Sequence, residues 1–262
     1  DLMNTDFRQE FDGKYILYCM IVTSLCFFAT WALAKAFLKD KTLVPELVQG
    51  SFRGSAAVLG TAFVLNMYGD TGMVPLMIIG AVPLYNIYSV IVLTIESPRR
   101  EEIEGSPVKN TIKGIVTNPI IISIVVGLLL SIFRVDFPLM IDNTIGNIAK
   151  MATPLALLAI GGSFEFSSAL KKMGPAVTGS AIKLVIMAAV FLPVAVWLGY
   201  RDAKLMALVI MLGSPTTPSC YIMAKNMKCD GTLTSSMVVI TTMMSAFTIT
   251  LIIFVLRTLG YL

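Results

Sequence analysis

Long apolar runs separated by short polar segments follow one another along almost the whole chain. Most of these runs approach the ~20 residues that an α-helix needs to cross a bilayer. They predict eight membrane spans, at 15–38, 54–68, 73–95, 114–133, 145–166, 175–198, 203–224 and 234–259. The second span is shorter than the others, and a charged loop at 96–113 is longer than the remaining connections. The pattern therefore predicts an all-α polytopic membrane protein.

The seventh predicted span is interrupted by a polar segment that contains two prolines. A proline lacks the backbone N–H and clashes with the preceding helical turn, so the helix should stop there. Backbone groups freed from hydrogen bonding at membrane depth are tolerated where they are buried in protein or line a cavity. A span broken in this way is typical of the substrate site of a secondary transporter. The candidate binding residues in this segment are Gly213, Ser214, Pro215, Thr216, Thr217, Pro218 and Ser219.

A weak internal repeat links the second and seventh predicted spans. The sequence Asn-Met-Tyr-Gly-Asp at 66–70 matches Asn-Met-Lys-Cys-Asp at 226–230, and a long apolar span follows each copy. Spans that lie five apart run in opposite directions, an arrangement called an inverted repeat. Two extra spans precede the second copy only, so we expect a ten-span protein that here lacks its first two spans. The expected units are 1–95, the remainder of the first repeat; 96–113, a loop; and 114–262, the second repeat.

The composition excludes several classes of protein. Hydrophobic residues make up 56% of the chain and charged residues only 14%, against about 25% charge in a soluble domain. The chain has no histidine, which excludes an HExxH metalloprotease. Its four cysteines lack the spacing of a metal site, and Asp70 and Asp230 fall in predicted turns instead of forming an aspartate pair within the membrane. We therefore predict no catalytic residue, no metal ion, no cofactor and no enzymatic activity.

Loop charges predict the orientation, because lysine and arginine concentrate on the cytoplasmic side of a membrane. One side collects twelve of these residues, with Arg53 among them, and the other side collects six. This asymmetry places the loop at 96–113 in the cytoplasm and both ends of the chain outside.

A series of short motifs occurs along the chain. They are Phe52-Arg53-Gly54-Ser55, Tyr68-Gly69-Asp70, Pro83-Leu84-Tyr85-Asn86, Asn118-Pro119, Thr153-Pro154, Gly161-Gly162 and Ser214-Pro215-Thr216. In order and spacing, these motifs resemble the auxin efflux carrier family, which includes plant exporters of the PIN type and bacterial carriers of the malonate type. The resemblance covers nearly the whole chain. It implies ten helices in two inverted repeats, with the fourth and ninth helices broken and crossing at mid-membrane, as in sodium/proton antiporters and bile-acid symporters.

Two positions depart from the family pattern. Ser55 stands where many members have asparagine, and Ala62 stands where a proline often follows. The short central loop resembles that of bacterial members, which implies the plasma (inner) membrane of a bacterium and argues against auxin as the substrate. The resemblance implies dicarboxylates such as malonate or malate instead.

The second half of a broken helix presents unpaired N–H groups and the positive end of the helix dipole, and together these can hold an anion. We expect the second halves to begin at 216–220 in the seventh span and at 61–64 in the second. Facing each other, the two starts would form a pocket for a carboxylate. The hydroxyl donors would be Ser55, Thr61, Thr216, Thr217 and Ser219, and Gly54, Gly60 and Gly213 would allow close approach.

Two further residues inside predicted spans are candidates for the site. Lys183 lies deep in its span, where a charge is costly. It either attracts the substrate, pairs with a carboxylate, or snorkels to the cytoplasmic edge. Asn86 lies in the Pro-Leu-Tyr-Asn motif and either binds the substrate or bridges two helices.

The combined prediction is a secondary transporter of small organic anions that works by alternating access. Two alternatives stay open: a sodium-coupled symporter of the bile-acid type, and a receptor or assembly subunit that binds without transport. The expected partners are a small organic anion, the lipid bilayer, H⁺ or Na⁺ as a coupling ion, and a second copy of the chain to form a homodimer. No nucleic acid partner is expected.

Overall fold

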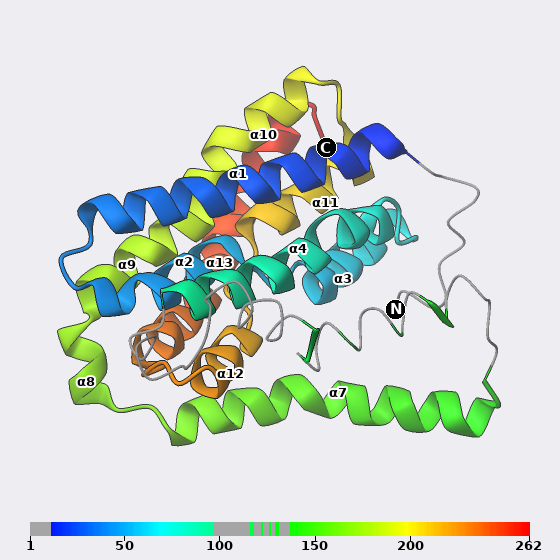
Figure 1. Cartoon of the computed structure of the whole chain (residues 1–262). Coiled ribbons are helices and arrows are strands. Elements are labelled where there is room, and N and C mark those ends of the chain that lie inside the picture. Colours follow the sequence, from blue (N-terminus) through cyan, green and yellow to red (C-terminus); the bar gives the residue numbers. More distant parts are fainter. Residues whose placement is uncertain (1–11, 97–115, 118–121, 123–125, 127–128, 131–136) are drawn as a thin grey trace.

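The computed structural model describes residues 12–96 and 137–262, together with 116, 117, 122, 126, 129 and 130. Five helical segments in this part of the chain are long and apolar enough to cross a membrane. They are α1 (Gly13–Phe37), α4 (Val74–Ile95), α7 (Leu139–Gly162), the run Met173–Trp197 and α13 (Thr232–Thr258) (Figure 1). The described residues form no strand beyond one isolated bridge. The predicted all-α polytopic membrane fold is thereby confirmed.

Two further spans each consist of two short helices with a non-helical break between them. The first is formed by α2 (Val44–Phe52) and α3 (Ala56–Tyr68). The second is formed by α11 (Asp202–Gly213) and α12 (Ser219–Asn226). In each case a turn leads from the second half into a long apolar helix, α4 or α13.

The span Met173–Trp197 is irregular in its middle. Here α9 (Met173–Ala181) passes through a π-helical turn, η4 (Ile182–Ile186), into α10 (Met187–Trp197). A π-helical turn inside a helix frequently marks a functional site. This one carries Lys183.

The remaining helices are short connections. A single 3₁₀ turn, η2 (Lys41–Leu43), leads from α1 into α2, and α8 (Phe166–Lys171) leads from α7 into α9. The predicted spans 15–38, 73–95, 175–198, 203–224 and 234–259 match observed helices to within a few residues. The predicted span 145–166 begins earlier, at Leu139, and ends at Gly162. The predicted span 114–133 and the loop 96–113 lie almost entirely outside the described residues.

The second span begins at Val44 instead of residue 54, so the sequence pattern misses its first half. Pro45, Glu46 and Gln49 give α2 the appearance of a loop, yet all of its residues are buried. Glu46 is tolerated there because Gly231 and Thr234, at the start of α13, donate hydrogen bonds to its carboxylate.

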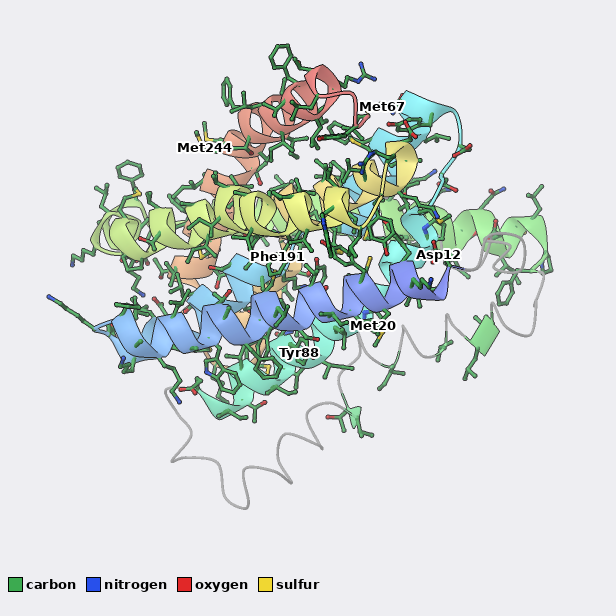
Figure 2. The ribbon with its side chains drawn as sticks, turned by 90° about the horizontal axis from the view of Figure 1, so that it is seen from above. Asp12, Met20, Met67, Tyr88, Phe191 and Met244 are labelled. Carbon is green, nitrogen blue, oxygen red and sulfur yellow. The ribbon has the colours of Figure 1, made fainter. Side chains whose placement is uncertain are left out.

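The helix α11 lies at the centre of the bundle, and every residue from Leu205 to Gly213 is buried. It packs against α3, α4, α10 and α13. On one side α1 packs along α4 and α2, and Figure 2 shows it beside α10, where the Tyr18 hydroxyl donates to the Phe191 carbonyl at 2.7 Å. By contrast, α7 lies at the edge (Figure 1), with only two of its residues buried.

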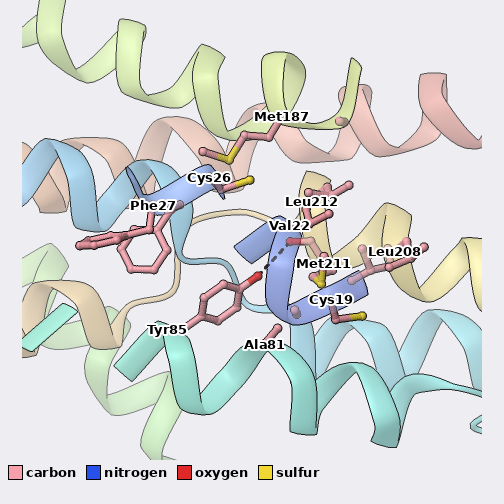
Figure 3. Packing of buried hydrophobic residues seen from close by; sticks show 14 of the residues in the cluster. Cys19, Val22, Cys26, Phe27, Ala81, Tyr85, Met187, Leu208, Met211 and Leu212 are labelled. Atoms are coloured by element: carbon pink, nitrogen blue, oxygen red, sulfur yellow. Dashed lines mark hydrogen bonds between the residues drawn. The ribbon is translucent and has the colours of Figure 1, made fainter. Parts of the chain in front are cut away.

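Close packing between α1, α4 and α11 supports the broken helices (Figure 3). Cys26 of α1 lies close to Met187 of α10, and the Tyr85 hydroxyl of α4 donates to the Met211 carbonyl of α11 at 3.3 Å. On the neighbouring side the rings of Phe27 and Tyr88 stack with centroids 4.4 Å apart. Of these contacts, the one between Tyr85 and Met211 reaches the last turn of a half-helix, α11.

Candidate functional site

The two breaks cross and pair with each other. Gly54 and Thr216 form an isolated antiparallel β-bridge, and the Ser55 N–H donates to the Pro215 carbonyl at 2.9 Å. The Thr216 hydroxyl donates to the Gly50 carbonyl at 2.7 Å. Each break therefore satisfies backbone groups that the other leaves free, as a break at membrane depth requires. The crossing expected from the family resemblance is present.

Gly54 is the point of closest approach in the crossing. A Cβ atom added there would lie 2.4 Å from the Ser214 hydroxyl oxygen and 2.8 Å from the Lys183 ammonium nitrogen. No larger residue fits without displacing one of these groups. The glycine is thus required by the close approach of the second break and of η4.

Lys183 binds the carboxyl end of α11. Its ammonium group donates to the Met211 and Leu212 carbonyls at 3.2 Å each, and the residue is only 1% exposed. These carbonyls belong to the last turn of the half-helix, where the dipole carries partial negative charge. Lys183 therefore neither snorkels to the membrane edge nor pairs with a described carboxylate.

Arg53 is the C-cap residue of α2, but its side chain extends to α12 and α4. Its guanidinium group donates to the Ser219 hydroxyl at 2.9 Å and to the Met223 sulfur at 2.8 Å. A longer contact of 3.4 Å reaches Ser89 on α4. The side chain is buried, so the assignment of Arg53 to the cytoplasmic surface is wrong.

The two cations share a common electrostatic situation. Every hydrogen bond that the structure describes for Arg53 and Lys183 goes to a neutral group. None of the ion pairs among the described residues includes either side chain. A buried charge without an opposite charge is expensive. Within the described part of the chain, the crossing therefore carries two side-chain positive charges that a bound anion would offset.

The amino-terminal ends of the other two half-helices add to this positive charge. α3 begins at Ala56 and α12 at Ser219, and among the described residues neither start has a side-chain cap. Helix starts of this kind present N–H groups and the positive end of the dipole. Both starts border the crossing, next to Ser55 and Pro218.

A cavity of about 280 Å³ opens beside the crossing. Its walls come from both breaks, from Val82, Tyr85 and Asn86 of α4, and from Thr153 and Leu157 of α7. Arg53 is the only charged residue among the described residues of this lining. A lining that is mainly apolar, with a few polar groups and one cation, suits a small organic anion.

The structure brings most, but not all, of the expected site residues together. Those that line the cavity are Ser55, Asn86, Pro215, Thr216, Thr217 and Pro218. Gly213, Ser214, Ser219 and Lys183 belong to the crossing but lie outside the lining. The Asn86 amide donates to the Val82 carbonyl at 2.9 Å, within its own helix.

Gly60 and Thr61 lie inside α3 and not at its start. The Thr61 hydroxyl donates to the Ala57 carbonyl one turn earlier, and Gly60 packs against Met77 and Val74 of α4. The expected start at 61–64 is therefore wrong, because the break falls at 53–55. Small residues here serve helix packing.

Sequence reasoning missed Arg53 as a site residue. Its position between a polar segment and a short span suggests a loop cation. The missed signal is that 44–52 and 54–68 together reach a full membrane span, which would have placed Arg53 at mid-depth.

Comparison with models of known protein families gives a match. A family model described as a membrane transport protein matches residues 9–253, which is most of the chain. No curated protein matches the sequence.

Proposed function

The chain belongs to the membrane transport protein family, that of the auxin efflux carriers, and on this premise we propose that it carries small organic anions across the membrane by alternating access. The observation that carries the proposal is that two buried cations, Arg53 and Lys183, lie at the crossing of two broken helices and that neither cation forms an ion pair with a described residue. Arg53 borders the cavity and is the primary anchor for a carboxylate, with Ser55 and Thr217 as hydroxyl donors.

The geometry favours an anion over a cation as the substrate. Two helix starts and two side-chain cations give the crossing a positive potential, which would repel a cation. Guanidinium groups bind carboxylates through paired hydrogen bonds, and Arg53 lines the cavity, whereas Lys183 lies outside the lining and binds two carbonyls. The remaining cavity wall supplies apolar contact for the carbon skeleton.

The architecture suggests how the site could reach both faces of the membrane. The order long helix, broken helix, turn, long helix occurs in α1 to α4 and again in α9 to α13. We propose that the two units are inverted repeats and that one bundle of helices rocks or slides against the other, as in other carriers of this type.

The proposed orientation has the loop 96–113 in the cytoplasm. Without Arg53 the loop cations still divide eleven against six. In this orientation both residues of the ion pair Lys172–Asp230 lie at helix ends on the cytoplasmic side. Both residues of the ion pair Lys204–Asp12 lie at helix ends on the outer side. Both pairs agree with the proposal.

The first test measures thermal stabilisation of the purified protein in lipid nanodiscs by a panel of mono- and dicarboxylates. We expect at least one carboxylate to raise the melting temperature of the wild type and of R53K, but not of Arg53→Gln. K204Q, which removes a cation far from the crossing, should respond like the wild type. Stabilisation that survives in Arg53→Gln would place the anion elsewhere.

A second test separates a carrier from a receptor. Proteoliposomes loaded with the stabilising carboxylate should accumulate its labelled form by counterflow, since alternating access exchanges substrate across the bilayer. Saturable binding without exchange would favour a receptor or assembly subunit.

A further inference from the structure

Lys183 is a buried lysine whose ammonium group binds the carboxyl end of a broken helix. Lys183 reaches the last turn of α11 from the π-helical turn η4, which packs against both α2 and α11. Its ammonium group donates to two backbone oxygens, the Met211 and Leu212 carbonyls, each 3.2 Å from the nitrogen. In the anion site proposed above, Lys183 adds positive charge but lies outside the cavity lining and does not bind the carboxylate.

The carboxyl end of a half-helix has a known use in ion-coupled carriers. Its unpaired carbonyls and negative dipole end coordinate Na⁺ or bind a proton that is moved with the substrate. In this chain those carbonyls are already occupied by a cation that is covalently part of the protein. We propose that the ammonium group of Lys183 is a built-in substitute for a bound coupling cation.

Ser214 supplies an independent observation at the same place. Its hydroxyl oxygen is fully buried and has no hydrogen-bond partner among the described residues. A Cβ atom added at Gly54 would lie 2.4 Å from this oxygen and 2.8 Å from the Lys183 nitrogen, so both groups lie close to the same point. Without the lysine side chain, two carbonyls and one hydroxyl would remain around an empty space. Such a set of neutral oxygens suits a monovalent cation.

This assignment has a functional consequence. A tethered cation cannot dissociate, so substrate binding needs no ion from solution, and the sodium-coupled alternative loses its ion site at α11. The same site should become visible as a binding site for small cations once the lysine is shortened. Both consequences can be measured, and the second needs no knowledge of the substrate.

The first measurement uses the wild type in lipid nanodiscs. Its melting temperature is recorded in N-methyl-D-glucamine, sodium and potassium chloride at equal ionic strength, with and without a stabilising carboxylate. We expect the same values in all three salts. A requirement for Na⁺, or a saturable rise in melting temperature with Na⁺, would overturn the proposal.

The second measurement uses Lys183→Ala and Lys183→Met. In N-methyl-D-glucamine both should melt several degrees below the wild type, because the carbonyls of Met211 and Leu212 lose their partner. Sodium or methylammonium should restore the alanine variant with a saturable concentration dependence. The methionine variant should recover much less, since its side chain fills the space. Lys204→Ala, which removes a cation from an ion pair at the far end of α11, should show no saturable recovery.

The outcomes are decisive without a known substrate. An alanine variant that melts like the wild type in N-methyl-D-glucamine, or that no small cation restores, would overturn the proposal. If the variant can be purified only with sodium or methylammonium present, that dependence supports it. Aggregation in every salt would count against it, because no cation then replaces the lysine. The melting temperatures of the Lys183 variants would have the same meaning if the protein transported no anion.

Discussion

Glu46 accepts two hydrogen bonds from Thr234, one from the backbone N–H and one from the hydroxyl, both at 2.9 Å. A third bond, also 2.9 Å, comes from the Gly231 N–H. The carboxylate thus caps the start of α13 from the side of α2, although the two residues are far apart in sequence. A negative charge at a helix start is favoured by the dipole. This contact joins the first broken helix to the last long helix.

Replacing Glu46 should destabilise the fold. E46Q keeps the size but removes the charge, and one amide nitrogen would face N–H donors. Hydrogen bonds to charged groups contribute about 1.5–3 kcal/mol each, so we expect a loss of at least about 2 kcal/mol in the free energy of unfolding. The measurement is thermal or denaturant unfolding in nanodiscs.

Glu165 is a matched control for this prediction, because it is exposed and lies before a short helix. E165Q should change stability by no more than about 0.5 kcal/mol. Equal effects of the two substitutions would show that the cap on α13 is not what stabilises this part of the fold.

Much of this fold can be predicted from the sequence, because apolar length and proline act locally. A proline interrupts a helix through its own backbone, whatever residues surround it. The break at Pro215 and Pro218 could therefore be predicted from the sequence. The first break could not, since it has no proline. Its position at 53–55 is set by pairing with Thr216 across the crossing, which no local pattern encodes.

The electrostatics of the site were also beyond local reasoning. Lys183 could be recognised as deeply placed, but its partners are carbonyls of residues far along the chain. Arg53 was misplaced because α2 has the composition of a loop and the burial of a core helix. In both cases, contacts with residues distant in the sequence determine which groups the charged side chain binds.

Gly54→Ala should disrupt the crossing. The new Cβ would lie 2.4 Å from the Ser214 oxygen, and overpacking of this kind costs about 1–3 kcal/mol. We expect a lower melting temperature and weaker anion binding together. Gly146→Ala is the control, because a Cβ there meets nothing within 4 Å and alanine favours the helix by up to about 1 kcal/mol. Normal stability of Gly54→Ala would mean that the breaks have room to separate.

Thr216→Val should lower the stability of the fold, whereas Thr217→Val should weaken carboxylate binding. Thr216 is buried and donates to the Gly50 carbonyl at 2.7 Å, so its loss leaves a buried acceptor unpaired at a cost of about 1–3 kcal/mol. Thr217 is half-buried in the cavity lining. Its loss should change stability by no more than about 0.5 kcal/mol but weaken carboxylate binding about tenfold, equivalent to about 1.4 kcal/mol. Both quantities come from unfolding and ligand-titration curves, and reversed effects would contradict the assigned roles.

The ion pair between Asp12 and Lys204 should make stability depend on pH at the end of the bundle where α1 and α11 begin. The hydrogen bond from Lys204, at 2.9 Å, lowers the pKa of Asp12 below its ordinary value of about 3.9, although partial burial opposes the shift. A lowered pKa in the folded state means that the stabilisation is present above about pH 4 and is lost as the pH falls through the folded value. Because the pair is partly exposed, we expect it to contribute at most about 1 kcal/mol and to weaken with salt.

Asp12→Asn tests this dependence without removing the helix cap, because asparagine can also accept the hydrogen bond that Asp12 receives from the Tyr15 N–H at 3.1 Å. The wild type should melt above the variant at neutral pH, and the difference should shrink toward zero as the pH falls below about 4. The measurement is a series of melting curves for both proteins from neutral to acidic pH at low ionic strength. A difference that stays constant through this range would show that the charge of Asp12 is not what joins the two helix starts.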